Sequence, residues 1–289
     1  MRLFHQGAQE APDRTGRRNA GRNAGRNARR TLALLASSLA LVGMLAVPST
    51  ASAATHRVVI VVGPVGSSTA NYIYNARIYA RYARSLGASV TEIYSPNATW
   101  ARVKSALQGA NMLIYLGHGN GWPSAYYPFN PYTKDGLGLN RTSGAGNSNV
   151  KYYGEYYLRT GVRMAANAVV LFNRLCYASG NNEWGAGYPS RTTARARVGN
   201  FGYGFLHAGA RAVFANAISS LKPIIHDLFR TNRTMAQIFR ADPAYVGTYR
   251  YTFQSGRTSW ATAILDPTAR NHYYHSVIGS LGMTAATWR

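Results

Sequence analysis

Cysteine and acidic residues are both scarce in this chain. A single cysteine, Cys176, occurs among 289 residues, which excludes an internal disulfide. Nine acidic residues accompany 32 lysines and arginines, and the formal net charge is +23. A charge of this size attracts anionic surfaces such as wall polymers, lipid headgroups or nucleic acid. The hydrophobic content of 46% can form a large core, so a fully disordered or fibrous chain is excluded.

The N-terminal region differs in composition from the rest. It is rich in arginine up to residue 30, then apolar over 32–47, and small residues follow up to Ala53. This order is typical of an export signal. We expect cleavage after Ala53, by the general or the twin-arginine route, and a secreted or extracytoplasmic protein without a transmembrane segment after cleavage. An uncleaved N-terminal anchor is the alternative, although the apolar run is short for a span of ~20 residues.

Residues 1–53 are therefore interpreted as a signal peptide with an extended basic region, and 54–289 as one domain. Removal of 1–53 takes away eight arginines and two acids, and leaves 24 basic and seven acidic side chains, a net charge of +17. We expect this surface to hold the protein near anionic cell-envelope polymers. No lysine–arginine cluster is dense enough for a dedicated nucleic-acid site, and Arg191, Arg195 and Arg197 are expected on a solvated loop.

Short apolar runs alternate with helical periodicity in the domain. Strands are expected over 58–62, 89–94, 112–116, 168–172, 212–215, 249–253 and 261–265. Helices are expected over 70–86, 98–107, 201–208, 223–229 and 234–239. This order predicts an α/β fold with a mostly parallel sheet and helices on both faces. Residues 120–160, rich in glycine, asparagine, proline and tyrosine, form an insertion that is functional or mobile.

A histidine and the cysteine each follow a buried apolar run. His118 comes just after 112–116, and Cys176 comes just after 168–172. Loops at the carboxyl ends of parallel strands carry the working residues of such folds. If the two strands are neighbours, the imidazole can activate the thiol as a nucleophile. The backbone N–H groups of Gly119 and Cys176 can then stabilise an oxyanion.

Each of these residues also has a structural explanation when taken alone. His118 can simply cap a strand, and Cys176 can be an inert core residue or form an intermolecular bridge. Their occurrence together, each before a glycine-containing loop, favours function.

Two segments around these residues resemble a known group of enzymes. Residues 113–119, Leu-Ile-Tyr-Leu-Gly-His-Gly, are similar to the histidine block of the caspase, gingipain, legumain and metacaspase group. Residues 169–180 resemble its cysteine block, and 205–213 resemble the helix and strand that follow. The sequence Cys-Tyr-Ala-Ser-Gly at 176–180 is one residue longer than the Cys-x-Ser-Gly of many relatives. The resemblance covers about residues 57–230.

The resemblance implies a caspase-like three-layer sandwich and a secreted cysteine endopeptidase that acts on a peptide or protein substrate. His118 would be the general base and acid, Cys176 the nucleophile, and Gly119 and Cys176 the oxyanion-hole donors. Arg174, two residues before the cysteine, would line the S1 pocket and favour an acidic P1 residue. Alternatively, Arg174 pairs with Glu183 or packs along the sheet.

Other chemistries lack their motifs. No His-Glu-x-x-His, Gly-x-Ser-x-Gly or dinucleotide-binding loop occurs, so neither a metal nor a cofactor is expected. His272 and His275 lack a third ligand and are interpreted as surface or packing residues. A catalytically silent caspase-like scaffold, which binds anionic cell-wall polymer or a protein partner through a basic, tyrosine-rich surface, is the alternative function. Acyl transfer to an amine would use the same two residues as hydrolysis.

Overall fold

The computed structural model of the protein describes residues 56–289. The expected export signal and its cleavage site lie outside the described residues.

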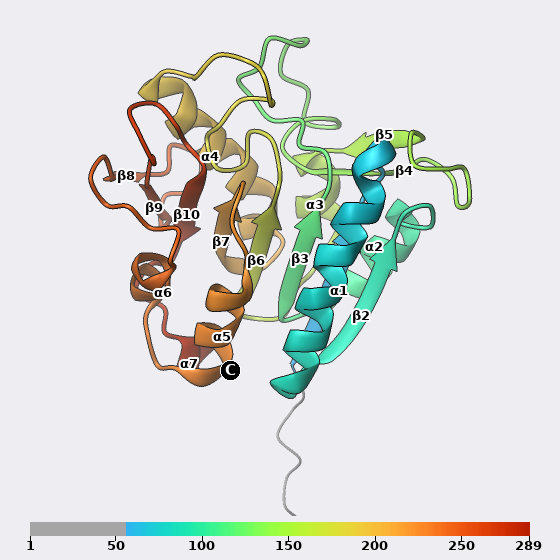
Figure 1. Cartoon of the computed structure of the whole chain (residues 1–289), viewed down its shortest axis with the longest axis horizontal. Coiled ribbons are helices and arrows are strands. Elements are labelled where there is room, and N and C mark those ends of the chain that lie inside the picture. The colour runs from blue at the N-terminus through green and yellow to red at the C-terminus, as the bar shows by residue number, and fades with distance from the viewer. Residues whose placement is uncertain (1–55) are drawn as a thin grey trace, which may run out of the picture. The chain divides into compact units, whose positions relative to one another are not determined.

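An eight-stranded sheet runs through the middle of the domain (Figure 1). Its strands lie in the order β2-β1-β3-β6-β7-β10-β9-β8. They are β2 (Ser89–Tyr94), β1 (Arg57–Val62), β3 (Met112–Leu116), β6 (Ala168–Asn173), β7 (Ala210–Asn216), β10 (His275–Gly279), β9 (Thr262–Leu265) and β8 (Tyr251–Gln254). The first five strands in this order are parallel, and the last three are joined by antiparallel pairing.

Helices cover both faces of the sheet. They are α1 (Thr69–Ser85), α2 (Trp100–Leu107), α3 (Glu155–Gly161), α4 (Arg191–His207), α5 (Lys222–Arg230), α6 (Met235–Ala241) and α7 (Ala285–Trp288). A short 3-10 turn, η1 (Gly66–Ser68), precedes α1. One core packs α1, α5, α6 and α7 against one face, and a second core packs α2, α3 and α4 against the other. The predicted mostly parallel α/β sheet with helices on both faces is therefore confirmed.

The strands are buried because alternate side chains enter the two cores. Val58 and Ile60 of β1 point into the core beneath α1, whereas Val59 and Val61 point into the opposite core. All five residues of β3 and all six of β6 are buried. Strands covered on both faces read as continuous apolar runs in the sequence, and this explains why these strands were predictable.

The order of the strands reverses beside β1. The chain passes from β1 to β2 on one side and then crosses to β3 on the other side, before continuing to β6 and β7. Ligands of doubly wound sheets bind outside the carboxyl ends of the strands near such a point. His118 and Cys176 both follow strands at this edge.

The insertion at 120–160 contains regular structure that the sequence did not indicate. It forms the two-stranded sheet of β4 (Leu137–Asn140) and β5 (Val150–Tyr153) and begins α3. Lys134 is 2% exposed, and its ammonium group donates to Asn120 Oδ1 at 2.8 Å, Ser124 Oγ at 3.0 Å and the Tyr126 carbonyl oxygen at 2.8 Å. A buried lysine with three acceptors, all within residues 120–126, fixes the conformation of the first part of the insertion.

Two further expectations need correction. Helix α4 begins at Arg191, ten residues before the predicted start at 201, so Arg191, Arg195 and Arg197 lie on a helix rather than on a loop. Arg197 is also buried, at 4% exposure. Strand β10 was not expected; it pairs antiparallel with β7, the last strand of the parallel part of the sheet.

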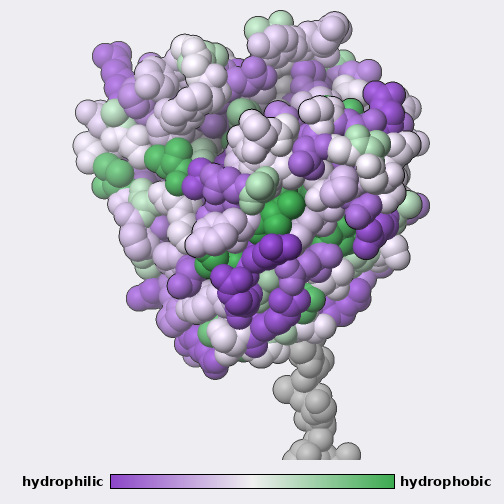
Figure 2. Space-filling view, turned by 45° about the vertical axis from the view of Figure 1, so that its right-hand side comes forward, coloured by the Kyte–Doolittle hydropathy of each residue, from purple (hydrophilic) through white to green (hydrophobic). Residues whose placement is uncertain are grey.

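Hydrophilic residues predominate on the face shown in Figure 2, where hydrophobic residues form small separate groups. Among residues 56–289, no helix combines the length and apolar character that a membrane span requires.

Candidate active site

His118 and Cys176 follow neighbouring parallel strands. Strand β3 pairs with β6, and Leu116 at the end of β3 lies opposite Asn173 at the end of β6. His118 is two residues beyond this pair, and Cys176 is three residues beyond it. The sequence alone did not settle whether the two strands are neighbours; their pairing meets that condition and brings both residues to one edge of the sheet.

The two loops are in direct backbone contact. A Cβ atom built on Gly119 would lie 2.0 Å from the carbonyl oxygen of Cys176, a separation that real Cβ atoms do not show. Two residues further on, a Cβ atom on Gly121 would lie 2.3 Å from Cβ of Tyr177. Glycine is therefore required at both positions for the loops to approach each other this closely.

The two N–H groups that were predicted to form an oxyanion hole lack an acceptor within residues 56–289. Across the described part of the chain, neither the backbone N–H of Gly119 nor that of Cys176 donates to a protein oxygen. Free backbone donors beside a candidate nucleophile can bind a developing oxyanion.

Strand β4 supports the turn that carries His118. The Tyr115 hydroxyl, buried beneath this turn, accepts from the N–H of Gly138 at 2.9 Å. The same hydroxyl lies 2.9 Å from the Gly138 carbonyl oxygen and 3.1 Å from that of His118. A Cβ atom on Gly138 would lie 3.2 Å from Cβ of His118. The insertion thus contacts the candidate base directly.

Burial favours the neutral form of both candidate catalytic groups. Burial lowers the pKa of His118 below its ordinary value, although the charge of Glu183 opposes this shift. Burial likewise raises the pKa of the Cys176 thiol; the backbone N–H of Trp184 counteracts this rise, and Glu183 adds to it. No hydrogen bond joins the His118 ring to the thiol among the described residues. The raised pKa of the Cys176 thiol is opposite in direction to the lowered pKa that pairing with an imidazole would produce.

Glu183 was considered only as a partner of Arg174, and its effect on His118 and Cys176 was missed. Its Oε1 accepts from the Tyr177 hydroxyl at 2.9 Å, and its charge acts on both His118 and Cys176. It forms no ion pair with Arg174 among residues 56–289, so the suggested Arg174–Glu183 pair is absent from this part of the chain. Only the sequence proximity of Glu183 to the cysteine could have indicated its role.

Arg197 joins the loop that follows His118 to the loop that follows Cys176. Its Nε donates to the Pro123 carbonyl oxygen and its Nη1 to the Asn181 carbonyl oxygen, both at 2.7 Å. The guanidinium carbon also lies 4.7 Å from the centre of the Tyr177 ring. A planar guanidinium with several fixed donors suits this bridging position.

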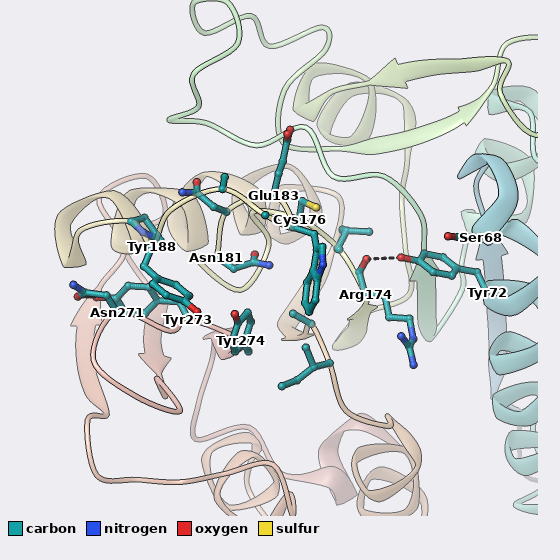
Figure 3. Close-up of a pocket in the computed structure, with 18 of the residues that line it drawn as sticks. Ser68, Tyr72, Arg174, Cys176, Asn181, Glu183, Tyr188, Asn271, Tyr273 and Tyr274 are labelled. Atoms are coloured by element: carbon teal, nitrogen blue, oxygen red, sulfur yellow. Dashed lines mark hydrogen bonds between the residues drawn. The ribbon is translucent and has the colours of Figure 1, made fainter.

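A groove of about 850 Å³ passes over Cys176 (Figure 3). Arg174 and Tyr72 lie on one side of the cysteine, and the Tyr72 hydroxyl donates to the Arg174 carbonyl oxygen at 3.3 Å. Arg174 is exposed, has a left-handed backbone with φ of 59°, and lacks a carboxylate partner in the described region. The groove therefore contains an exposed guanidinium on this side of Cys176, without a carboxylate partner among residues 56–289.

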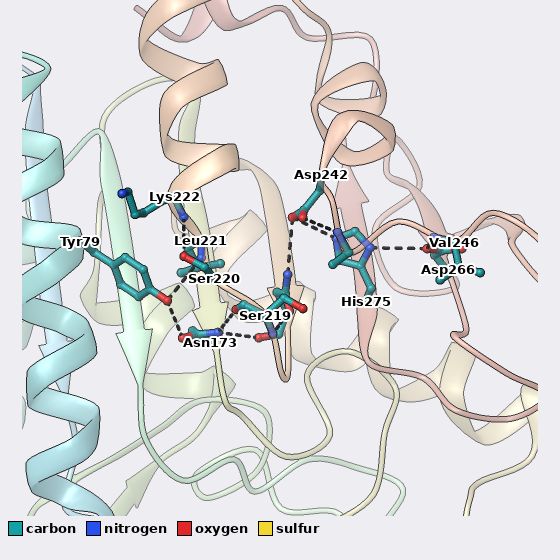
Figure 4. A network of polar contacts seen from close by, with 12 residues as sticks. Tyr79, Asn173, Ser219, Ser220, Leu221, Lys222, Asp242, Val246, Asp266 and His275 are labelled. Carbon is teal, nitrogen blue, oxygen red and sulfur yellow. Dashed lines mark hydrogen bonds and ion pairs between the residues drawn. The ribbon is translucent and has the colours of Figure 1, made fainter.

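A polar network follows the same edge of the sheet (Figure 4). Tyr79 donates to Asn173 Oδ1 at 3.0 Å, and Asn173 donates to the Asn216 carbonyl oxygen at 2.9 Å. At its far end, the buried His275 ring has Nε2 3.5 Å from Asp242 Oδ2 and Nδ1 3.6 Å from Asp266 Oδ2. His275 also stacks on Phe239, so it has a packing role.

No cluster of three or more potential metal ligands occurs in residues 56–289. No protein-family model matches the chain, and no curated protein matches it either.

Proposed function

We propose that the chain is a cysteine endopeptidase of the caspase-like group, with His118 and Cys176 as its catalytic pair. Its sequence blocks at 113–119 and 169–180 resemble those of the group, and its sheet, covered by helices on both faces, is compatible with a three-layer sandwich. The expected export signal would make it a secreted enzyme.

One observation carries this proposal. The pairing of β3 with β6 brings His118 and Cys176 to one edge of the sheet, where the Gly119 backbone touches that of Cys176. The N–H groups of Gly119 and Cys176 both lack an acceptor among the described residues. A base, a nucleophile and two oxyanion donors are the parts that acyl transfer requires.

In the proposed reaction, His118 takes the thiol proton as Cys176 Sγ attacks the peptide carbonyl carbon. The two N–H groups hold the oxyanion of the tetrahedral intermediate. Collapse of this intermediate breaks the C–N bond, and His118 gives its proton to the leaving amine. His118 then deprotonates a water molecule, which attacks the thioester and releases the acid and the thiol. Because burial favours the neutral form of both residues, we expect the proton to move during the attack rather than before it.

Arg174 supports a preference for an acidic P1 residue. It lines the groove next to Cys176, and it has no carboxylate partner among residues 56–289. An unpaired guanidinium binds a carboxylate through charge-assisted hydrogen bonds.

A panel of peptides that differ only at P1 (Asp, Glu, Asn, Gln, Lys, Arg) tests the proposal, with products identified by mass spectrometry. We expect cleavage after Asp or Glu, no cleavage by Cys176→Ala, and a loss of ~10²–10⁴-fold in kcat for His118→Ala. Arg174→Gln should lower kcat/KM for the acidic peptides alone. Best cleavage after Arg or Lys would overturn the acidic preference. An added amine in the same assay distinguishes peptide ligation from hydrolysis by its products.

A silent scaffold that binds anionic polymer is the second candidate. The raised pKa of the Cys176 thiol favours it, because an inert buried cysteine has the same property. Cationic groups also lie over tyrosine rings, with Lys151 Nζ 5.2 Å from the Tyr153 ring centre and the Arg159 guanidinium 5.4 Å from that of Tyr156. Salt-sensitive binding to an anionic polymer, without cleavage of any peptide, would support this function instead.

A further inference from the structure

The groove over Cys176 has two chemically different sides. In Figure 3, Arg174 and Tyr72 lie on one side of Cys176, while Tyr188 and Tyr274 lie on the other. The first side is cationic, and the second is aromatic. The proposed function assigns only one part of the substrate, the acidic P1 side chain, which would bind on the side of Arg174.

The groove also contains unusually exposed apolar side chains. Trp184 is 88% exposed, the highest value among the large apolar residues of the described region, Tyr188 is 57% exposed and Ile218 is 47% exposed. All three line the groove. Large apolar side chains that gather in one exposed hollow mark a binding site, because water solvates them poorly.

Tyr188 and Tyr273, which form an aromatic wall of the groove, are held in place by neighbouring residues. The Tyr188 ring stacks on His272 with ring centres 3.7 Å apart and an angle of 18° between the planes. Tyr273 is buried, and its hydroxyl donates to Asn271 Oδ1 at 3.1 Å. A preformed aromatic wall binds a ligand with little loss of conformational freedom.

Trp184 connects this wall to the nucleophile. It lies eight residues after Cys176 and lines the same groove, and its side chain is free of protein contacts over most of its surface. Gly185 follows it with φ of 84°, a conformation that favours glycine. A ligand bound at Cys176 would therefore lie beside an indole ring that is available to cover it.

We propose that Trp184, Tyr188 and Tyr274 form a second specificity subsite, which binds an aromatic or large aliphatic side chain of the peptide whose acidic side chain contacts Arg174. This inference rests on the proposed peptidase function. Charge and shape together select the ligand: one carboxylate for Arg174, and one apolar side chain for the aromatic wall on the other side of Cys176. A substrate with both groups would contact both sides of the groove at once.

Four peptides test the subsite in two ways. They carry Asp or Asn at P1, combined with Phe or Gly at the neighbouring positions. Turnover is measured with wild type, Trp184→Ala, Trp184→Phe and Trp260→Ala; Trp260 is 41% exposed and does not line the groove. Binding is measured by calorimetry with Cys176→Ala and with Cys176→Ala combined with Trp184→Ala, so that no cleavage is needed.

We expect Phe in place of Gly to raise kcat/KM by ~10–100-fold for the Asp peptide, as for apolar groups in other pockets. Trp184→Ala should remove this gain, whereas Trp184→Phe and Trp260→Ala should keep it. Cleavage of Asp peptides without any effect of Phe would overturn the subsite and leave the peptidase proposal intact. Trp184-dependent binding of Phe peptides to Cys176→Ala, without turnover by wild type, would support the subsite and overturn the peptidase. Failure of every peptide to bind would overturn the subsite.

Discussion

Gly119 contacts the backbone of Cys176 so closely that a methyl group at Gly119 would lie 2.0 Å from the Cys176 carbonyl oxygen. The histidine loop and the cysteine loop are therefore held at one fixed separation. Catalytic groups need such fixed separations, because a displacement of ~1 Å can lower a rate ~10²-fold.

Gly119→Ala should separate the two loops. We expect peptide cleavage to fall by ~10²-fold or more, and the free energy of unfolding to fall by about 1–3 kcal/mol from overpacking. Steady-state kinetics and urea unfolding measure the two effects. Gly256→Ala is the matched control, because a Cβ atom there meets no atom within 4 Å. Equal behaviour of the two variants would show that the loop contact is unimportant.

The thiol of Cys176 should react slowly at neutral pH. Burial raises its pKa, so iodoacetamide should label it more slowly at pH ~7 than a free cysteine of pKa ~8.5, and faster as pH rises. Unfolding in urea should remove this protection. His118→Ala should change labelling little, because a neutral imidazole supplies no charge. Fast labelling of wild type near neutral pH that is lost in His118→Ala would instead show a preformed thiolate–imidazolium pair.

Strands at the centre of the sheet could be predicted because burial on both faces makes them continuous apolar runs. The positions of His118 and Cys176 followed from the ends of two such runs, and Gly119 from its place next to His118. Whether β3 and β6 are neighbours depends on strand order, which no local pattern contains; the structure was needed for that step.

The rest of the site depends on contacts between distant segments. Arg197 looked like a solvated charge, yet it bonds to Pro123, 74 residues away in sequence. Strand β10 is only five residues long and carries a histidine and a serine, so its apolar signal is weak. Glu183 acts through space on His118, and the sequence contains no periodic signal for such an effect.

Glu183 should control the protonation of the catalytic pair. Its negative charge raises the pKa of both His118 and Cys176, so Glu183→Gln should lower both. The acidic limb of kcat/KM, which rises as His118 loses its proton, should move to lower pH, and labelling of Cys176 should also begin at lower pH. Gln keeps an oxygen that can accept from Tyr177. Tyr177→Phe is the control, since it removes that hydroxyl and leaves the charge. Unchanged pH profiles in Glu183→Gln would show that its carboxylate does not act on the pair.

Arg197 should be irreplaceable by lysine. The guanidinium donates to the carbonyl oxygens of Pro123 and Asn181 at once. The single ammonium group of a lysine cannot reach both acceptors with the same geometry. We expect Arg197→Lys to lower the free energy of unfolding by about 1–3 kcal/mol, as for a buried acceptor left unpaired. Cleavage should fall as well, because both loops of the groove shift. Arg195→Lys, on the exposed face of the same helix, should be near wild type in both assays. Equal stability of the two variants would contradict the bridging role.

His275 should make the stability of the domain depend on pH. Burial alone would lower its pKa, but Asp242 and Asp266 outweigh burial and raise it above the ordinary value. Because the folded pKa exceeds the ~6.5 of the unfolded chain, the protonated ring stabilises the fold fully below pH ~6.5, and this stabilisation is lost as pH rises through the folded pKa.

The carboxylate of Asp266 sets the acidic limit of this stabilisation. Burial would raise its pKa, but His275 and the N–H groups of Val246 and Gly247 outweigh burial and lower it. Its contribution is therefore present above the unfolded pKa of ~3.9 and is lost as pH falls through the folded pKa. His275→Gln should be most destabilising relative to wild type between pH ~4 and ~6.5, and the difference should shrink at higher pH.

Urea unfolding of wild type and His275→Gln across pH 4–9 measures this window. His226→Gln is the control, because the His226 side chain is 51% exposed and lies on α5 at the surface. A difference between His275→Gln and wild type that stays constant with pH would mean that the buried ring is neutral and acts only by stacking on Phe239. A difference that shrinks as pH rises would mean that the positive charge of His275 between Asp242 and Asp266 holds β10 and the end of α6 together.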